Sequence, residues 1–220
     1  MTFTLLILAV LMAVVVGWLL RQTLNTAPWQ PRAADDAASG SAFDTGPRVL
    51  GLAAFLAVVT SLFALFISAY LMRRHMHDWA DLPEPDILWV NTVLLVFASL
   101  VYHRSRGAAI RGEAATLKIG LALAGLLTFL FLAGQLIAWR ELHDTGHYAS
   151  RNPANAFFYL LTAVHGLHLA GGLWVWARSV VKIMSGAEPE AIRTSVQLCT
   201  VYWHYLLLVW LVLFALLLYT

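Results

Sequence analysis

The sequence has little of what soluble enzymes use for chemistry. It contains one cysteine among 220 residues, which excludes an internal disulfide and leaves no paired thiols for a zinc or iron–sulfur site. Charged residues make up only 12% of the chain, the formal net charge is +2, and no glycine-rich phosphate loop occurs. These features argue against nucleic-acid binding. Cys199 lies inside an apolar run and is interpreted as a small packing residue.

Apolar surface is abundant instead. Hydrophobic residues make up 60% of the chain, the mean hydropathy is +0.74, and several uncharged runs reach about 18 residues, the length that crosses a bilayer. Lipid forces each spanning segment to close its own backbone hydrogen bonds, so these runs are expected to be helices. The sequence therefore predicts an all-α, polytopic membrane helix bundle with six transmembrane helices. They are expected at residues 3–20, 49–72, 87–103, 117–139, 155–178 and 196–219.

Basic residues are unevenly distributed among the predicted loops. Ten lie in the first, third and fifth loops and four in the other two, so the positive-inside rule places the odd loops in the cytoplasm and both termini on the outer side. The first loop has no apolar period and is rich in Ala, Asp, Ser, Gly and Pro, which is typical of a flexible linker. The expected organisation is an N-terminal transmembrane helix (1–20), a flexible cytoplasmic linker (21–47) and a five-helix core (48–220).

Two outer loops carry histidines beside carboxylates. His75 and His77 lie near Asp78 in a segment that also contains prolines, and His143, Asp144 and His147 occupy the second loop. Histidines beside carboxylates are able to bind a divalent cation, which is one interpretation of these loops. A solvated turn is the more common structure for acids beside prolines, and an acidic docking surface for a basic partner is a third interpretation.

Three histidines lie within predicted spans. His165 and His168 are three residues apart, about 60° around a helix, and therefore share a face, while His204 lies in the last span. Polar groups inside a membrane point to protein, a cavity or each other. Three interpretations remain open: a haem ligated by His165 and His204, a metal site, and neutral histidines that hydrogen-bond between helices.

The residues around these histidines resemble subunit III of the haem-copper terminal oxidases over about residues 48–220. The first matching stretch has Tyr159, Thr162, His165, Gly166, His168 and Gly171, and the second has Tyr202, Trp203, His204 and Trp210. Two further helices match with Trp89, Asn91, Thr92 and Ser99, and with Gln135 and Trp139. Several motifs in the correct order make the resemblance specific.

The resemblance implies a non-catalytic subunit of a cytochrome c or quinol oxidase in the bacterial inner membrane. Such a subunit packs on catalytic subunit I in a complex with subunit II, organises lipid, and supports sustained oxygen reduction and proton uptake in aerobic electron transport. Haem and copper are then expected in the partner subunits, bound phospholipid on this chain, and no active site here. The residues of the signature become helix-packing groups, and Arg178, at a helix end, becomes the candidate lipid contact.

Four positions depart from the family pattern, because carboxylates common in the family are replaced by Ala69, Ala138, Gln197 and Leu207. A proton relay needs a titratable group inside the bilayer, so a structural and lipid-organising task is expected instead. The alternative functions are a self-sufficient haem-binding cytochrome that uses His165 and His204, and a nitric oxide reductase accessory subunit of the same broad family.

Overall fold

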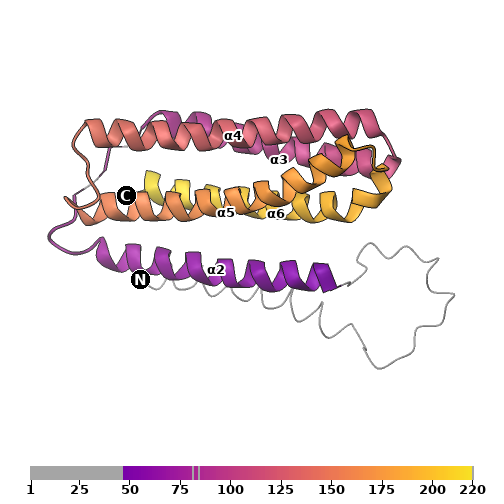
Figure 1. Ribbon diagram of the computed structural model, residues 1–220. Coiled ribbons are helices and arrows are strands. Elements are labelled where there is room, and N and C mark those ends of the chain that lie inside the picture. The colour runs from indigo at the N-terminus through magenta and orange to yellow at the C-terminus, as the bar shows by residue number, and fades with distance from the viewer. Residues whose placement is uncertain (1–46, 81, 84, 220) are drawn as a thin grey trace, which may run out of the picture. The chain divides into compact units, whose positions relative to one another are not determined.

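A computed structural model describes residues 47–80, 82–83 and 85–219, and all regular secondary structure in these ranges is helical. The helices are α2 (Pro47–Arg73), α3 (Ile87–Arg111), α4 (Ala114–Asp144), α5 (Pro153–Met184) and α6 (Pro189–Leu218) (Figure 1). Each is long and apolar enough to cross a membrane, which confirms the predicted all-α membrane protein for these five spans. The predicted helix at 1–20 and the linker that follows it lie outside the described residues.

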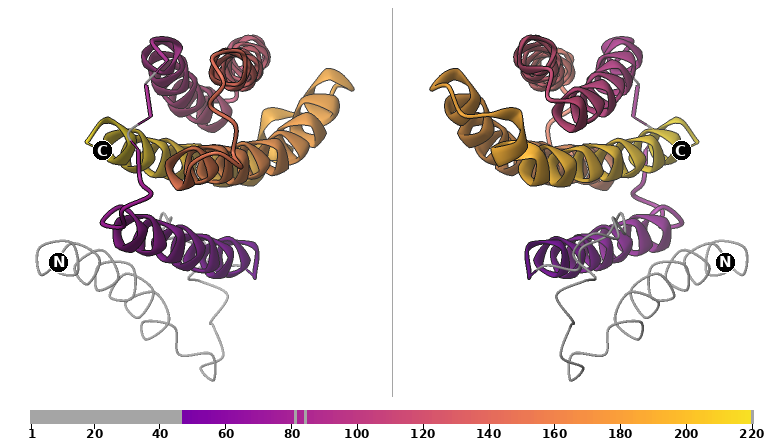
Figure 2. Two further views of the ribbon diagram at one scale, coloured as in Figure 1. Left: turned by 90° about the vertical axis from the view of Figure 1, so that its left-hand side faces the viewer. Right: turned by 90° about the vertical axis from the view of Figure 1, so that its right-hand side faces the viewer.

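The chain divides into two compact units, residues 1–67 and 68–220. The described part of the first unit is a single apolar stretch of α2. In the second unit, α3 and α4 form one layer and α5 and α6 form another (Figure 2). Helix α3 packs against α4 and α6, and α5 packs against the same two helices. The α3–α4 and α5–α6 connections lie at one end of this bundle, and the α4–α5 connection lies at the other (Figure 1).

Helix ends follow local backbone chemistry. Helix α3 stops where Gly112 takes a left-handed φ of 74° and its N–H bonds to the carbonyl of Ala108, a conformation that glycine adopts most easily. Helix α5 starts after Asn152, whose side chain accepts a hydrogen bond from the Ala154 N–H at 3.1 Å. Pro153 follows the cap at the first helical position, where its missing N–H is not needed.

Several helices extend beyond the spans that hydropathy predicts. The third span was expected to end at residue 103, but α3 continues to Arg111, and the connection to α4 is only Gly112 and Glu113. Arginine and alanine favour helix, so the backbone stays helical after the apolar run ends. Basic residues that were assigned to the third and fifth loops therefore lie mostly on helix ends, as Arg104 and Arg178 do.

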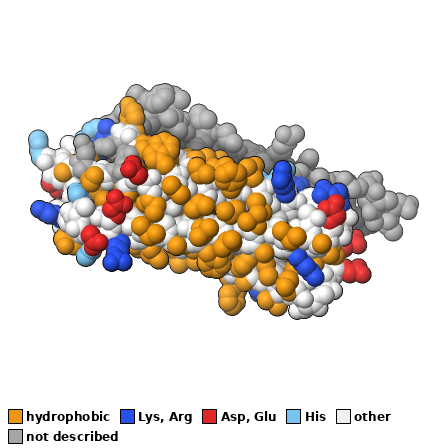
Figure 3. Space-filling view, turned by 90° about the horizontal axis from the view of Figure 1, so that it is seen from above, with side chains coloured by type: hydrophobic (Ala, Val, Ile, Leu, Met, Phe, Trp, Pro, Cys, Tyr) orange, Lys and Arg blue, Asp and Glu red, His pale blue; other side chains and the backbone are white. Residues whose placement is uncertain are grey.

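The exterior has a wide apolar band with charges at its two ends. The face shown in Figure 3 carries hydrophobic side chains across its middle, while Lys, Arg, Asp, Glu and His gather at the ends. Large apolar side chains such as Leu126, Leu167 and Leu208 are more than half exposed. A soluble domain would bury such groups, whereas a lipid-facing surface retains them.

Candidate functional site

Three tryptophan–threonine hydrogen bonds connect the helices of the bundle interior. In each, an indole N–H donates to a threonine hydroxyl oxygen on another helix, and that hydroxyl donates to the carbonyl four residues earlier at 2.7 to 2.8 Å. Donor and acceptor are thus both satisfied without water. We call these pairs the Trp–Thr ties. They are Trp139–Thr162 from α4 to α5 (2.9 Å), Trp203–Thr128 from α6 to α4 (3.1 Å) and Trp210–Thr92 from α6 to α3 (2.9 Å).

Glycines make room for large side chains beside these ties. A Cβ on Gly172 of α5 would lie 2.7 Å from Cε1 of Tyr202 and 2.9 Å from Cη2 of Trp203, closer than side chains tolerate. A Cβ on Gly125 of α4 would overlap the indole of Trp176. Small residues are what allow membrane helices to approach closely. These two glycines therefore fix how near α5 comes to α6 and to α4.

Further polar contacts join α6 and α5 to their neighbours. The Tyr202 hydroxyl donates to the carbonyl of His168 at 2.9 Å, which links α6 to α5. The indole N–H of Trp176 donates to the carbonyl of Leu121 at 2.8 Å, which links α5 to α4. Trp176 is thus a packing residue, whereas Trp174, two positions earlier on α5, is exposed. Such bonds join α5 to α4 and to α6, and α6 to α3 and to α4.

The three intramembrane histidines have different neighbours. His165 is fully buried, and its ring packs against those of Phe131 and Trp210 at centroid distances of 5.8 and 5.3 Å. The Nδ1–H of His168 donates to the carbonyl of Val164 on its own helix at 2.7 Å. Packing and local hydrogen bonding therefore occupy these two side chains.

His204 belongs to a separate polar group between α6 and α3. Its Nδ1 lies 2.6 Å from the Ser99 hydroxyl, and its ring stacks on that of His103 at 5.8 Å. Among the described residues, no group of three or more His, Cys, Asp or Glu side chains is arranged to hold a metal ion. The geometry supports interhelical hydrogen bonding more directly than ligation.

Two amide side chains of the signature are buried without a hydrogen-bond partner in the part of the chain that the structure describes. Asn91 is 0% exposed and Gln135 is 5% exposed, and neither amide group bonds to any described residue. Asn91 lies directly over Gly134, where a Cβ would overlap its side chain. An unbonded buried amide lowers stability, so these positions contrast with the fully paired Trp–Thr ties.

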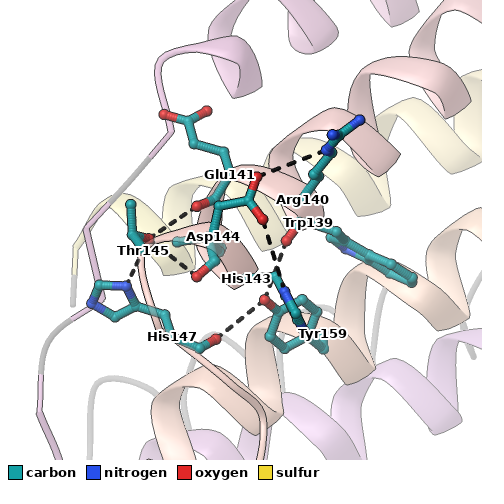
Figure 4. A network of polar contacts seen from close by, with 9 residues as sticks. Trp139, Arg140, Glu141, His143, Asp144, Thr145, His147 and Tyr159 are labelled. Atoms are coloured by element: carbon teal, nitrogen blue, oxygen red, sulfur yellow. Dashed lines mark hydrogen bonds and ion pairs between the residues drawn. The ribbon is translucent and has the colours of Figure 1, made fainter.

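Tyr159 connects the end of α4 to the loop that follows it (Figure 4). Its hydroxyl lies 3.2 Å from the carbonyl of His147 and 3.4 Å from that of Trp139. The Thr145 hydroxyl, at the end of α4, lies 3.0 Å from Nδ1 of His147 (Figure 4). These contacts order the end of α4. His143 also lies there, 4.0 Å from Asp144 and edge-to-face against the ring of Tyr148.

The remaining signature glycines and Arg178 do not join this interior. A Cβ on Gly171 would meet nothing within 4 Å, and one on Gly166 would make an ordinary contact with Leu132 at 3.7 Å. Arg178 is exposed near the cytoplasmic-side end expected for α5 and forms no ion pair with a described residue. Gly171 and Arg178 face outward, where lipid or a partner chain would lie, whereas Gly166 is half-buried beside α4.

Sequence reasoning missed several interior residues. Thr128 accepts a hydrogen bond from Trp203, and Gly125 and Gly134 on the same helix leave space for side chains of neighbouring helices. None of the three belongs to the matched motifs. Their only signal was the presence of small and hydroxyl residues in an otherwise apolar helix. Since every face of α4 is apolar, the sequence does not show which face looks inward.

Charged groups at the two ends of the bundle form exposed pairs. Two hydrogen bonds from Arg73 lower the pKa of the Asp78 carboxyl, and the Nε of Arg111, 2.5 Å from Glu113, lowers the pKa of that carboxyl through a hydrogen bond and its charge. Asp78 is therefore held in an ion pair instead of facing an open cation site. Asp81 and Glu84 of the same loop lie outside the described residues.

Comparison with known proteins gives this architecture a family. Residues 81–220 match the family model for cytochrome c oxidase subunit III. The chain belongs to the cytochrome c oxidase subunit III family. It is 31% identical over 179 residues to cytochrome c oxidase subunit 3 of Synechocystis sp., covering 77% of this chain and 74% of the relative. Similarity to cytochrome c oxidase subunit 3 of Thermostichus vulcanus is 29% over 77% of this chain and 86% of that one.

Quinol oxidases are represented as well. The chain is 24% identical to cytochrome bo(3) ubiquinol oxidase subunit 3 of Pseudomonas aeruginosa, over 77% of its own length and 83% of the relative's. The resemblance inferred from the histidine and tryptophan motifs is thereby confirmed. The protein is an integral membrane, non-catalytic subunit III associated with an oxidase complex, and this family does not carry the complex's haem and copper centres. The matches support neither the self-sufficient cytochrome nor the nitric oxide reductase accessory protein.

Proposed function

We propose that this subunit III packs on catalytic haem-copper subunit I, in a complex with subunit II, and organises phospholipid beside it to sustain oxygen reduction and proton uptake. The family match over residues 81–220 carries the proposal. The bundle supports it, because the Trp–Thr ties join α6 to α3 and α4, and α4 to α5, while the outer faces remain apolar. An outer face of that kind suits lipid and membrane-embedded partners.

The signature residues are proposed to act through helix packing. Most of them make contacts inside the bundle, and this supports a role in shaping the surface that partners meet. Arg178 is the proposed lipid contact, because it is exposed and lacks an acidic partner among the described residues. Anionic headgroups attract such a side chain at a membrane surface.

We infer a topology with both termini on the outer side of a bacterial inner membrane. Residues 1–20 would form an anchor helix, 21–47 a cytoplasmic linker and 48–220 the five-helix core. The support is charge, since Arg104, Arg106, Arg111 and Lys118 lie near the α3–α4 connection, at the same end as Lys182 and Arg193 beside the α5–α6 connection (Figure 1).

Affinity capture from native membranes tests the association. The tagged full-length chain should recover a larger subunit with the absorption of haem, identified by mass spectrometry, whereas a tagged membrane protein of another family should not. Recovery of the chain alone, under detergents that keep oxidases intact, would contradict the proposal. A stoichiometric Soret band on the purified chain, lost in His165→Phe, would contradict it in favour of the cytochrome.

The proposed lipid contact of Arg178 is tested separately, by measuring the phospholipid that copurifies with the protein. Arg178→Gln should lower the amount of phospholipid that copurifies, since it removes an exposed charge at the bilayer surface. Arg140→Gln is the matched control, because Arg140 is also exposed but lies near Asp144 at the other end of the bundle. Equal lipid retention in both variants and the wild type would remove Arg178 from the proposal.

A further inference from the structure

Four polar side chains gather where α3 and α6 meet at the surface of the bundle. Ser99, His103 and Arg106 are four and three residues apart, so they lie along one side of α3. From α6, the Nδ1 of His204 lies 2.6 Å from the Ser99 hydroxyl, and its ring stacks on that of His103. Arg106 is close enough to His204 to interact with it electrostatically. We call these four residues the α3–α6 polar cluster.

The bond to Ser99 determines which nitrogen of the His204 ring is a donor. Ser99 is buried, and its hydroxyl makes no second hydrogen bond to a described residue. A hydroxyl has one hydrogen, and Nδ1 of His204 is the acceptor within reach, so Ser99 donates and Nε2 carries the ring proton. The His204 side chain is exposed, so its Nε2–H is a hydrogen-bond donor at the surface.

Arg106 adds donors whose acceptor the chain does not supply. Its Nε is buried and bonds to no atom in the part of the chain that the structure describes, and its guanidinium forms no ion pair there. Helix α3 contains no Asp or Glu, and the acid of α6, Glu190, lies about 21 Å along the helix axis from His204. A buried guanidinium N–H without an acceptor is costly, which points to an anionic partner from outside the chain.

The depth of the cluster indicates where that partner comes from. At about 1.5 Å per residue, His103 lies about 24 Å along α3 from Ile87, and His204 lies about 21 Å along α6 from Leu218. Ile87 and Leu218 are at the same end of the bundle, so both rings lie inside a hydrocarbon core of roughly 30 Å. Lipid phosphates lie outside that core. An anion at this depth is a side chain of another membrane-spanning helix.

A second copy of this chain has no such side chain. The acids within the described helices lie in a first or last turn, at Glu141, Asp144 and Glu190, and residues 1–20 contain none. The partner helix therefore belongs to a different protein. Its anion is a carboxylate, because Asp and Glu are the acidic side chains and because guanidinium and imidazole N–H groups form charge-assisted hydrogen bonds with them.

The surroundings of the cluster suit a helix. Leu100 on α3 and Leu208 on α6 are more than half exposed, and Val201 is 43% exposed. Leu208 and Val201 are four and three residues from His204, so they share its side of α6. Membrane helices associate through close apolar packing around a few interhelical hydrogen bonds, and this face offers both.

We propose that the α3–α6 polar cluster is the docking point for a transmembrane helix of the catalytic subunit. That helix places an Asp or Glu carboxylate against the guanidinium of Arg106 and the Nε2–H of His204. The inference deepens the proposed function and rests on it for the identity of the partner. It assigns the contact to the α3–α6 face, whereas the face of α5 around Leu167 stays outside it.

Photo-cross-linking in native membranes tests the face while the cluster stays intact. A benzophenone amino acid in place of Leu208 should attach the full-length chain to the haem-containing subunit, at a peptide with an Asp or Glu within one turn. The same amino acid in place of Leu167, which is also exposed, should not. Attachment from position 167 alone, equally from both positions, or to lipid alone would overturn the choice of face. An attached peptide without an acid would overturn the carboxylate.

Affinity capture tests the donors themselves. Arg106→Gln combined with His204→Phe, in the tagged full-length chain, should lower recovery of the catalytic subunit about tenfold, because the partner's carboxylate stays buried without either donor. Arg104→Gln is the matched control. It removes the same charge from the same helix, but Arg104 is exposed on another side of α3, so recovery should stay at the wild-type level.

Circular dichroism and size-exclusion chromatography show whether the variants fold, and the cross-link decides where the double variant does not. Wild-type recovery in the folded double variant would overturn the proposal, and so would an equal loss in Arg104→Gln. A wild-type chain that recovers no catalytic subunit contradicts the proposed function itself. A wild-type chain that recovers it, with no effect of the double substitution, contradicts this docking point alone.

Discussion

The interior of the α3–α6 bundle and its two ends solve the same electrostatic problem in different ways. Inside, no Asp, Glu, Lys or Arg is buried among the described residues, and polar groups are mostly paired one to one, as in the Trp–Thr ties. At the ends, exposed pairs such as Arg111–Glu113 form where water offers an alternative to each partner. A lost polar contact therefore destabilises the protein more in the interior, where no water is present to replace the missing partner, than at the exposed ends.

The glycine positions give the sharpest test of that contrast. Gly172→Val should lower the free energy of unfolding by about 3 kcal/mol or prevent folding, because its Cβ would collide with Tyr202 and Trp203. Unfolding in mixed detergent micelles, followed by circular dichroism, measures the change. Gly171→Val is the control one position away; it meets open space and should change stability by less than about 0.5 kcal/mol. Similar losses in both variants would refute the packing argument.

At the unpaired amides, removal of a polar group from the interior is expected to raise stability instead of lowering it. Gln135→Met keeps the shape of the side chain but removes an amide that has no described partner, so it should raise the free energy of unfolding by about 2 kcal/mol. The same micelle titration measures it. Thr162→Val, which removes a hydroxyl that is bonded, should instead destabilise. A loss of stability in Gln135→Met would mean that the folded protein does bond this amide.

Some of this interior was readable from the sequence. Apolar run length predicted five of the described helices, and the motif around His165 led to the correct family. The helix ends were less readable, because hydropathy marks the bilayer core and α3 continues past it to Arg111. Interhelical hydrogen-bond partners could not be predicted where a helix is apolar on every face. For this reason Thr128 was not predicted as the acceptor for Trp203.

The histidines show the same division. Their spacing correctly placed His165 and His168 on one helix, but it could not show that His165 lies between Phe131 and Trp210 while His204 pairs with Ser99. Those contacts depend on how α5 and α6 are rotated against α4 and α3. Rotation is set by residues such as Gly172, whose role appears only when the neighbouring helix is in place.

A single Trp–Thr tie should be worth less than a glycine contact. Thr128→Val removes the acceptor for Trp203 at nearly constant volume and should cost about 1 kcal/mol, the usual scale for interhelical hydrogen bonds in membranes. A double-mutant cycle with Trp203→Phe isolates the bond, since the double variant should be little worse than Trp203→Phe alone. Thr116→Val, exposed at the start of α4, controls for the substitution itself. Full additivity in the cycle would show that the bond adds no stability.

The smallest effect is expected at the ends, where pH provides the test. The pKa of Glu113 is lower in the folded protein than its ordinary value because of the hydrogen bonds from Arg111, so the pair's stabilisation is fully present above the unfolded value. It is lost as pH falls through the lowered folded value, in the acid range below about pH 4.5. Melting temperatures of wild type and Glu113→Gln should therefore differ slightly at pH 7, converge as the pH falls below 4.5, and differ less in high salt, because both side chains are exposed. A difference that does not shrink as the pH falls below 4.5, or that resists salt, would show that an end pair behaves like an interior one.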